Sequence, residues 1–253
     1  MPGTGTQSIE RAVVLLREIA SRPQAGWGLR DLAQHCELDH GTVHRMLKCM
    51  LAQGLVQQRR ADSRYFIGPL TFELGLSVPG RPGLADAIHV ALKKITRGKP
   101  QLNSVGFLLS GDDCVCVARA GSVAYTRAEN STRVGQRFPL LAKASGVAMV
   151  AAMRPDEAAA VCTRNRRRLA HLGARHLARL DEMVKATRRE GYAISEGLIW
   201  QGVNSVALAF GPSGAPLGSI SLSAGFADHS PGALRKLLPE LRAATASLGA
   251  SSA

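Results

Sequence analysis

One stretch near the start of the chain decides its fold: DHGTVHRMLKCMLAQG, residues 39–54. Asp39 is a residue type that caps the start of helices, and Gly54 is the type that ends them. Between them, apolar residues recur at intervals of three and four, which is the spacing of one helical face. The pattern predicts a helix that buries Val43, Met46, Leu47, Met50 and Leu51.

Similar but shorter patterns flank this segment. Residues 8–20 and 29–36 have the periodicity of helices, and a loop with Pro and Gly separates them. After Gly54 the spacing of apolar residues becomes that of strands, over residues 55–60 and 64–68. The polar turn Ala-Asp-Ser lies between these two segments. Three short helices followed by a hairpin predict a winged helix-turn-helix. A further helix is expected over residues 69–78.

The linker-like sequence PGRPG, residues 79–83, marks a predicted boundary. We therefore expect one domain over residues 1–78 and another over residues 79–253. The second part alternates helical and strand patterns, which favours an α+β domain with an antiparallel sheet flanked by helices. The strands are predicted at 104–109, 114–119, 123–127, 192–196, 205–210 and 218–224, and the helices at 84–94, 144–152, 155–162, 177–191 and 231–248.

The charge of the chain is unevenly distributed. The 253 residues carry a formal net charge of +13, which points to a polyanionic partner such as nucleic acid. Residues 1–80 hold nine Lys and Arg against seven Asp and Glu, a balance of +2, whereas residues 81–253 hold 23 against 12, a balance of +11. The net charge is therefore weak support for DNA binding by the first domain.

The cysteines and the apolar segments indicate the compartment. Five cysteines without CxxC spacing are expected to be reduced thiols. Cys114 and Cys116 fit an alternating strand better than redox or metal chemistry. The N-terminal MPGTGTQSIE lacks a basic segment, and the most apolar run, 140–153, is short and contains Lys143. We expect a cytoplasmic protein without a cofactor.

Five short motifs carry a resemblance that extends from residue 7 to about residue 248. They are QSIERA at 7–12, TVHR at 42–45, RYFIG at 64–68, REGY at 189–192 and SLS at 221–223. In this order the chain resembles the IclR (isocitrate lyase regulator) family of bacterial transcription factors. The resemblance implies a GAF-like effector-binding domain, a homodimer or homotetramer, and control of genes for small-molecule catabolism.

Candidate DNA contacts lie on the outward side of the helix predicted between Asp39 and Gly54. Arg and Thr can meet guanine and thymine in the major groove, and flanking cations can hold phosphates. Thr42, His44 and Arg45 are assigned to double-stranded operator DNA in the groove, and Lys48 to its backbone. The hairpin is expected to contact adjacent phosphates or a minor groove. The remaining candidates are His40, Arg59, Arg60 and Arg64.

Two alternatives compete for this helix. The face could be an ordinary exposed polar surface, or His40 and His44 could bind a metal, although no HExxH glutamate accompanies them. The family usually has Ser where this chain has Gly41. One hydroxyl contact is therefore missing, and the operator is expected to differ.

The resemblance also implies an effector site for a small organic acid. Backbone N–H groups at the start of a helix and hydroxyls on alternate strand positions can donate to a carboxylate. Family members that bind small keto acids tend to have Asp at position 195 and Cys at 205, whereas this chain has Ser at both. A different acid is expected, with larger and aromatic acids as candidates. The alternative is a sheet whose serines bind no ligand. The residues are Ala144, Ser145, Gly146, Ser195, Ser205, Ser221 and Ser223.

Other functions remain as alternatives at this stage. The basic run at 164–168, with Arg175 and Arg179, is interpreted as a solvated surface that adds nonspecific DNA affinity. Ser145 and Lys143 faintly suggest a nucleophile and a base, but GPSGA at 211–215 is not a nucleophile elbow. The alternative to an effector-controlled transcriptional regulator is a small-molecule-binding protein or hydrolase without sequence-specific DNA binding. A helix-turn-helix that contacts protein is a third possibility. The sequence does not distinguish a repressor from an activator.

Overall fold

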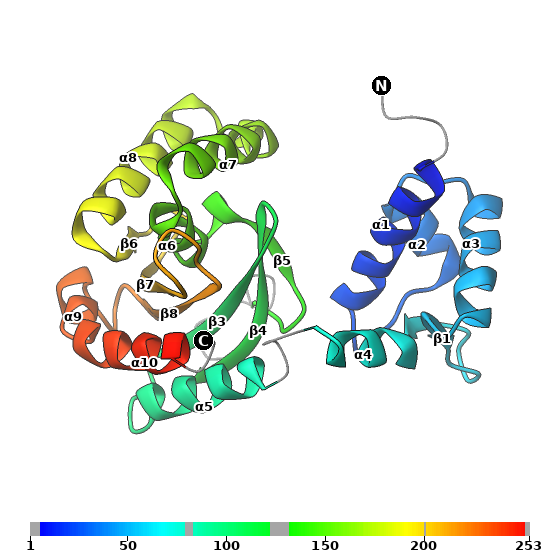
Figure 1. Ribbon diagram of the computed structural model, residues 1–253, viewed down its shortest axis with the longest axis horizontal. Helices are drawn as coiled ribbons and strands as arrows, with labels where there is room; N and C mark the ends of the chain where they lie inside the picture. Colours follow the sequence, from blue (N-terminus) through cyan, green and yellow to red (C-terminus); the bar gives the residue numbers. More distant parts are fainter. Residues whose placement is uncertain (1–5, 79–82, 122–131, 200, 251–253) are drawn as a thin grey trace. The chain divides into compact units, whose positions relative to one another are not determined.

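The computed structural model describes residues 6–78, 83–121, 132–199 and 201–250 (Figure 1). The chain divides into two compact units, residues 1–82 and 83–253. Among the described residues, no helix combines the length and apolarity needed to cross a membrane.

The first unit is a winged helix-turn-helix, as predicted. Its elements are α1 (Gln7–Ser21), α2 (Leu29–His35), α3 (His40–Ala52), β1 (Val56–Gln58), β2 (Tyr65–Ile67) and α4 (Pro69–Leu76). The two strands pair as an antiparallel hairpin, and Trp27 forms a bridge with Tyr65. The predicted stripe of α3 buries Val43, Leu47 and Met50 in the core that the three helices share, because these positions recur at helical spacing.

The second unit has one sheet of six described strands in the order β5-β4-β3-β8-β7-β6, and neighbouring strands are antiparallel. The antiparallel sheet with flanking helices confirms the predicted fold class. The elements are α5 (Leu84–Thr96), β3 (Asn103–Ser110), β4 (Asp113–Gly121), β5 (Arg137–Pro139), η2 (Leu140–Ala142), α6 (Ala144–Ala152), α7 (Pro155–Arg168), η3 (Ala170–Leu172), α8 (Ala174–Glu190), β6 (Ala193–Glu196), β7 (Val203–Phe210), β8 (Gly218–Gly225), α9 (Pro231–Arg235) and α10 (Leu238–Ala250).

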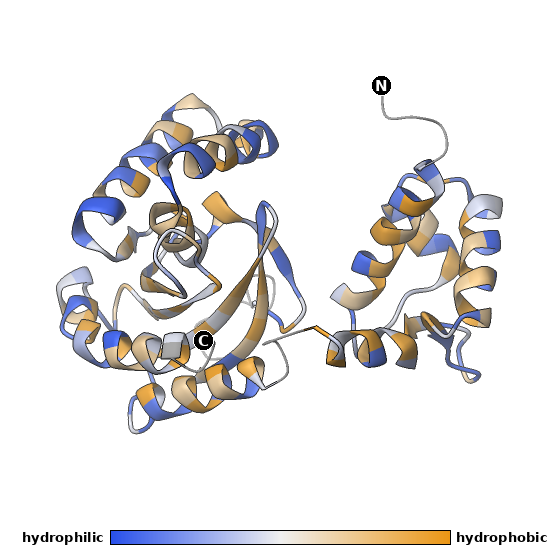
Figure 2. Cartoon of the chain, in the orientation of Figure 1, coloured by the Kyte–Doolittle hydropathy of each residue, from blue (hydrophilic) through white to orange (hydrophobic). Residues whose placement is uncertain are grey.

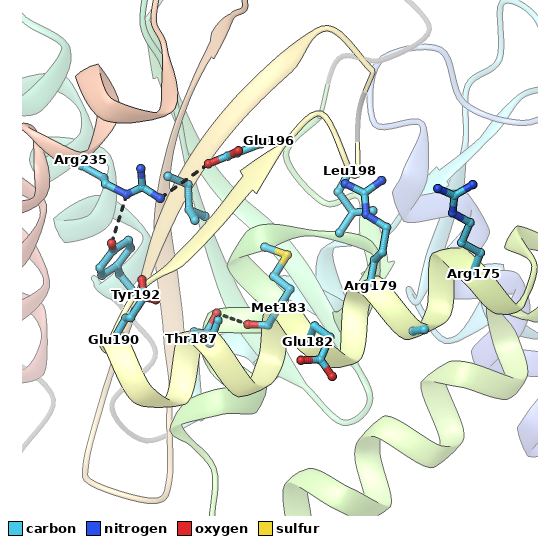
Figure 3. A pocket seen from close by; sticks show the side chains of 13 residues that line it. Arg175, Arg179, Glu182, Met183, Thr187, Glu190, Tyr192, Glu196, Leu198 and Arg235 are labelled. Atoms are coloured by element: carbon cyan, nitrogen blue, oxygen red, sulfur yellow. Dashed lines mark hydrogen bonds and ion pairs between the residues drawn. The ribbon is translucent and has the colours of Figure 1, made fainter.

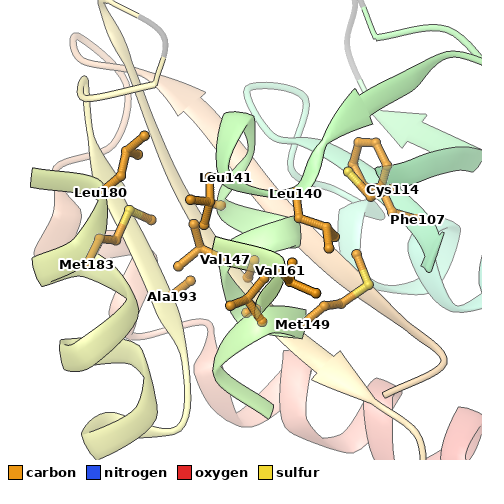
Figure 4. Packing of buried hydrophobic residues seen from close by; sticks show 14 of the residues in the cluster. Phe107, Cys114, Leu140, Leu141, Val147, Met149, Val161, Leu180, Met183 and Ala193 are labelled. Atoms are coloured by element: carbon orange, nitrogen blue, oxygen red, sulfur yellow. The ribbon is translucent and has the colours of Figure 1, made fainter. Parts of the chain in front are cut away.

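Each face of the sheet has its own core. One face packs on α6, with α7 and α8 beyond it, and Figure 4 shows the buried side chains of this cluster. The other face packs on α5 and α10. The strands are predominantly hydrophobic, whereas α7 and α8 carry hydrophilic residues along one side (Figure 2). Helix α6 is buried from Ala144 to Val150, so it has no solvent-facing side over that length.

The C-terminal part differs from the prediction. A single helix over residues 231–248 is wrong, because the chain forms two helices, α9 and α10. Pro239 explains the break, since it has no N–H to donate and its ring would clash with the carbonyl of Arg235 in a continuous helix. Strand β5 was not predicted, and α7 continues beyond the predicted residue 162. The strand expected at 123–127 lies outside the described residues.

The basic run on α7 has a structural role, which the sequence interpretation missed. Arg164 Nε lies 2.7 Å from Asp112 Oδ2, and the pKa of that carboxyl is lowered by its hydrogen bonds with Arg164. Three ion pairs connect α7 to the turn between β3 and β4, to the first residue of β4, and to α8. The pairs are Arg164 with Asp112, Arg166 with Asp181, and Arg168 with Asp113.

The close packing of α6 generates a first prediction. A Cβ built on Gly146 would lie 2.0 Å from the carbonyl oxygen of Leu140, so only glycine fits there without a shift of the backbone. We expect Gly146→Ala to lower the unfolding free energy of the second unit by about 1 to 3 kcal/mol. Urea denaturation measures this loss. Gly249→Ala is the control, because its Cβ would meet nothing within 4 Å, and equal stability of the two variants would contradict the prediction.

Candidate functional site

The start of α3 is fixed by a side-chain cap. The Thr42 N–H donates to Asp39 Oδ2 over 2.8 Å, and this hydrogen bond lowers the pKa of the Asp39 carboxyl below its ordinary value. The backbone of Asp39 is extended outside the helix, as a capping residue requires. Helix α3 therefore begins at a defined residue, with its first turn held in place.

The predicted recognition residues share the outer side of α3. His40, His44, Arg45 and Lys48 are exposed, and Thr42 is half-buried. Arg45 Nη2 donates to Thr42 Oγ1 over 3.3 Å, so two of the predicted base contacts are coupled. Within the described part of the chain, no cluster of three or more His, Cys, Asp and Glu residues suits a metal ion. The outer side of α3 can offer cations and hydroxyls to a groove.

The three predicted arginines of the hairpin differ in the contacts that they make. Arg59 forms two hydrogen bonds with Asp62 and lies over the Phe66 ring, 4.7 Å from its centroid. Arg64 donates to the carbonyls of Ala25 and Gly26, each over 3.3 Å. Arg60 is exposed at the turn and forms no ion pair among the described residues. Arg60 is therefore the hairpin cation best able to contact a phosphate.

Four predicted effector residues come together on the sheet. Ser195 lies directly opposite Ser205, and Ser205 opposite Ser223. Ser221 is two positions from Ser223, so both side chains point to one face. That face packs on α6. Ala193 and Ala207, each two positions from a serine on its own strand, belong to the buried cluster around α6.

The same register adds a residue that sequence reasoning missed. Asn103 lies opposite Ser223 and extends the row of Ser195, Ser205 and Ser223 onto β3. Its neighbour Val105 belongs to the α6 core, which places Asn103 on the same face. No local motif marks Asn103, because its role depends on which strand pairs with β3. The structure alone reveals it.

The other three predicted effector residues form the first turn of α6. Ala144, Ser145 and Gly146 are buried, and no side chain of the described residues caps their N–H groups. Met153, directly after α6, bridges to Gly214 in the turn between β7 and β8. At the other end of the helix, a Cβ on Gly146 would meet Leu140, and the Leu140 N–H donates to the Asp112 carbonyl in the turn between β3 and β4. The first turn of α6 and the four serines therefore belong to the same unit, on the face of the sheet that α6 covers.

A buried cation adjoins the start of α6. Lys143 is the N-cap residue, is only 7% exposed, and its ammonium lies 3.9 Å from the centroid of the Phe138 ring. Its Nζ donates to Thr132 Oγ1 over 3.3 Å. Burial lowers the pKa of Lys143 to about 8, against the effect of the nearby Cys114 and Cys116 thiols. The sequence interpretation had left this lysine out of the site.

A second cation approaches from β4. Arg119 lies opposite Val105, on the face of the sheet that packs on α6. Its Nη1 donates to the Thr132 carbonyl over 3.1 Å, so Arg119 and Lys143 contact the same residue. Two positive groups therefore meet at Thr132, and one of them, Lys143, also stands at the positive end of the α6 dipole. This arrangement suits an anionic group.

A separate groove lies along α8, β6 and α9 (Figure 3). It has a volume of about 610 Å³, and none of the seven predicted effector residues lines it. Arg235 crosses one end, 3.6 Å from Glu196 and with Nε 3.3 Å from the Tyr192 hydroxyl. This groove is distinct from the region at the start of α6.

A winged helix-turn-helix followed by an α+β domain fits the class of two-domain transcriptional regulators, but a fold does not by itself imply a function. Comparison with known families agrees with this class. Residues 8–60 match the IclR helix-turn-helix domain, and residues 81–250 match the C-terminal domain of the bacterial transcriptional regulator IclR. The chain belongs to the IclR family of bacterial transcriptional regulators, which confirms the predicted resemblance.

Several relatives are named as regulators. An HTH-type transcriptional regulator of Mycobacterium tuberculosis is 30% identical over 155 residues, which span 61% of this chain and 58% of that protein. The glycerol operon regulatory protein of Streptomyces griseus is 28% identical over 79% of this chain and 77% of its own length. The transcriptional repressor IclR of Escherichia coli is 25% identical over 77% and 71%.

Solved structures share the fold. An IclR-type regulator from Silicibacter sp. TM1040 has a TM-score of 0.72 and 25% identity, and the match covers 95% of this chain and 94% of that one. An IclR homolog from Microbacterium hydrocarbonoxydans, complexed with 4-hydroxybenzoate, has a TM-score of 0.72 and 16% identity over 97% and 98%. At 16% identity the second likeness shows the fold alone.

The outer face of α3 yields a prediction about DNA. We expect Arg45→Ala to abolish the gel shift of an operator obtained by in vitro selection, because a bidentate arginine contact discriminates between bases by about 1 to 3 kcal/mol. Gel filtration should show an unchanged oligomeric state. Arg97→Ala, which removes an exposed charge from the second unit, controls for net charge. Wild-type operator affinity of Arg45→Ala would refute the assignment.

The buried lysine yields a prediction about pH. An unfolded lysine titrates near 10.5 and Lys143 near 8, so between these values the unfolded chain binds a proton that the folded chain lacks. Stability therefore rises with pH in this window, by about 3 kcal/mol at most. Lys143→Met should lose this rise. Urea denaturation of both proteins from pH 7.5 to 10.5 measures it, and parallel curves would show that burial does not perturb Lys143.

Proposed function

We propose that this regulator binds a small organic acid in its second unit and that the acid controls operator affinity or promoter activation. The observation that carries the proposal is the buried start of α6, which no described side chain caps and which has the cation Lys143 at its N-cap. Buried N–H groups at a helix start need an acceptor, and an anion is the ligand that also suits the helix dipole.

The surroundings support an acid rather than another anion. Lys143 and Arg119 supply positive charge, and Phe138 and Val105 supply apolar surface for a carbon skeleton. A carboxylate attached to an apolar body matches both features. The 4-hydroxybenzoate bound to the homolog from Microbacterium hydrocarbonoxydans supports including aromatic acids among the candidates.

For the first unit, we propose that α3 enters the major groove of double-stranded operator DNA. Thr42, His44 and Arg45 contact bases, and Lys48 contacts the phosphate backbone. His40 lies at the start of the same exposed side. In the hairpin, Arg60 contacts a phosphate, while Arg59 and Arg64 hold the hairpin in shape through the contacts described above.

We further propose that the chain acts as a homodimer, or as a homotetramer of two such dimers. Large hydrophobic side chains are exposed in the first unit, with Ile9 66% exposed on α1 and Phe72 69% exposed on α4. Leu74 and Leu76 add to the exposed apolar surface of α4. A second copy would remove these side chains from water, and a dimer matches an operator with two-fold symmetry.

A screen of aliphatic and aromatic carboxylic acids tests the effector proposal. An acid that binds only the folded state at 100 times its Kd stabilises that state by about 2.7 kcal/mol, so its melting temperature should rise by several degrees. The same acid should change operator affinity in a gel shift. The corresponding primary alcohols serve as uncharged controls. An acid that binds and leaves operator affinity unaltered would disprove control by that acid.

A further inference from the structure

One carboxylate lies among the three arginines of the β1–β2 hairpin. Asp62 accepts two hydrogen bonds from Arg59, from Nε over 2.9 Å and from Nη2 over 2.5 Å, so the contact is bidentate. The Arg64 N–H donates to the same carboxylate over 3.3 Å. The hydrogen bonds from Arg59 are the main reason why the pKa of Asp62 is lowered to about 2, so the carboxylate is charged at neutral pH.

The backbone of the turn holds Asp62 beside Arg59. The Ser63 N–H donates to the Arg59 carbonyl, and the Arg59 N–H donates to the Arg64 carbonyl, each over 2.9 Å. Ser63 has a left-handed backbone, with φ at 56°, and its carbonyl accepts from Gln58 Nε2 over 2.9 Å. The ion pair therefore belongs to a preformed turn, which distinguishes it from a chance contact between two long surface side chains.

This ion pair competes with DNA for Arg59. A phosphate that took the place of the carboxylate would replace one charge-assisted, bidentate contact by another, so the exchange gains little. It would also leave the Asp62 carboxylate facing a phosphate of the same sign. Arg60 carries neither penalty, because it forms no ion pair within the part of the chain that the structure describes. Two neighbouring arginines therefore differ in their availability to DNA.

We propose that Asp62 withholds Arg59 from DNA and thereby limits the affinity of the hairpin for duplex DNA of any sequence. This inference rests on the proposed function, in which the first unit binds operator DNA and Arg60 contacts a phosphate. Arg64 stays bound to the carbonyls of Ala25 and Gly26, so Arg59 is the arginine that Asp62 controls. Phosphate contacts carry no sequence information, so the limit applies to operator and other DNA alike.

The salt dependence of DNA binding tests the inference on the full-length protein. Each phosphate contact adds about 0.9 to the slope of log affinity against log salt concentration. Fluorescence anisotropy of a labelled random-sequence duplex, from about 50 to 200 mM salt, measures this slope. We expect Asp62→Asn to steepen it by about 0.9 and to bind about fivefold more tightly at about 100 mM salt. Asparagine keeps an oxygen for the Arg64 N–H, so the turn stays closed.

A double variant and two single variants complete the comparison. Arg59→Gln combined with Asp62→Asn replaces a neutral ion pair by two neutral amides, so it should keep the wild-type slope. Arg60→Gln should make the slope shallower by about 0.9. Glu37→Gln is the control for net charge, because Glu37 is exposed in the turn before α3 and forms no ion pair among the described residues. It frees no arginine, so it should also keep the wild-type slope.

Three results would overturn the inference and leave DNA binding by the first unit in place. The slope could stay unchanged in Asp62→Asn, or it could steepen equally in Glu37→Gln, which would make net charge a sufficient cause. A slope below that of the wild type in the double variant would show that Arg59 already contacts a phosphate. If the wild type binds neither an operator nor the random duplex, the proposed function fails together with the inference, and this result is distinct from the other three.

Nuclear magnetic resonance of the wild type decides the point even if Asp62→Asn does not fold. The Nε–H signal of Arg59 should keep its chemical shift when the duplex binds, because Asp62 remains its acceptor. A large change of this shift on binding would show that Arg59 exchanges its partner for DNA, and the inference would be wrong.

Discussion

The burial of α6 is the constraint on which the second unit depends. A helix without a solvent-facing side over Ala144–Val150 must be covered by the sheet, by α8 and by η2, and Gly146 allows η2 to approach the helix backbone. Burial also removes water from the first turn, so its N–H groups cannot rely on solvent. The packing that stabilises the unit therefore creates a region that favours an anion, and core and candidate site cannot be separated.

The same constraint explains why a lysine can stand at the N-cap. Burying Lys143 carries a desolvation cost, which is why its pKa falls to about 8. At neutral pH most of the lysine is still protonated, so the region keeps its positive charge. The contact with the Phe138 ring offsets part of the lost hydration. A positive group that is expensive to bury, beside a helix start, makes anion binding more favourable than either feature alone.

The sequence predicted what is local and missed what depends on pairing. The stripe of Val43, Leu47 and Met50 and the alternation of Cys114 and Cys116 follow from periodicity, and both lie where expected. Asn103 and Arg119 could not be found, because their positions opposite Ser223 and Val105 depend on the strand order β4-β3-β8. The break before α10 is readable from Pro239, because a proline interrupts a continuous helix. The ion pairs of the α7 arginines could not be predicted either, because their partners lie on other elements of the chain.

In the first unit, the cap that starts α3 is linked by hydrogen bonds to a candidate base contact. Asp39 holds the N–H of Thr42, and Thr42 in turn accepts from Arg45, so the cap that starts α3 also orients a candidate base contact. Gly41 sits between them, and a Cβ there would lie 3.3 Å from Asp39 Oδ2. Glycine at this position therefore leaves the cap undisturbed and offers no hydroxyl of its own. In the proposed complex, discrimination among operator bases therefore depends on Thr42, His44 and Arg45, and the cap holds two of these three in one arrangement.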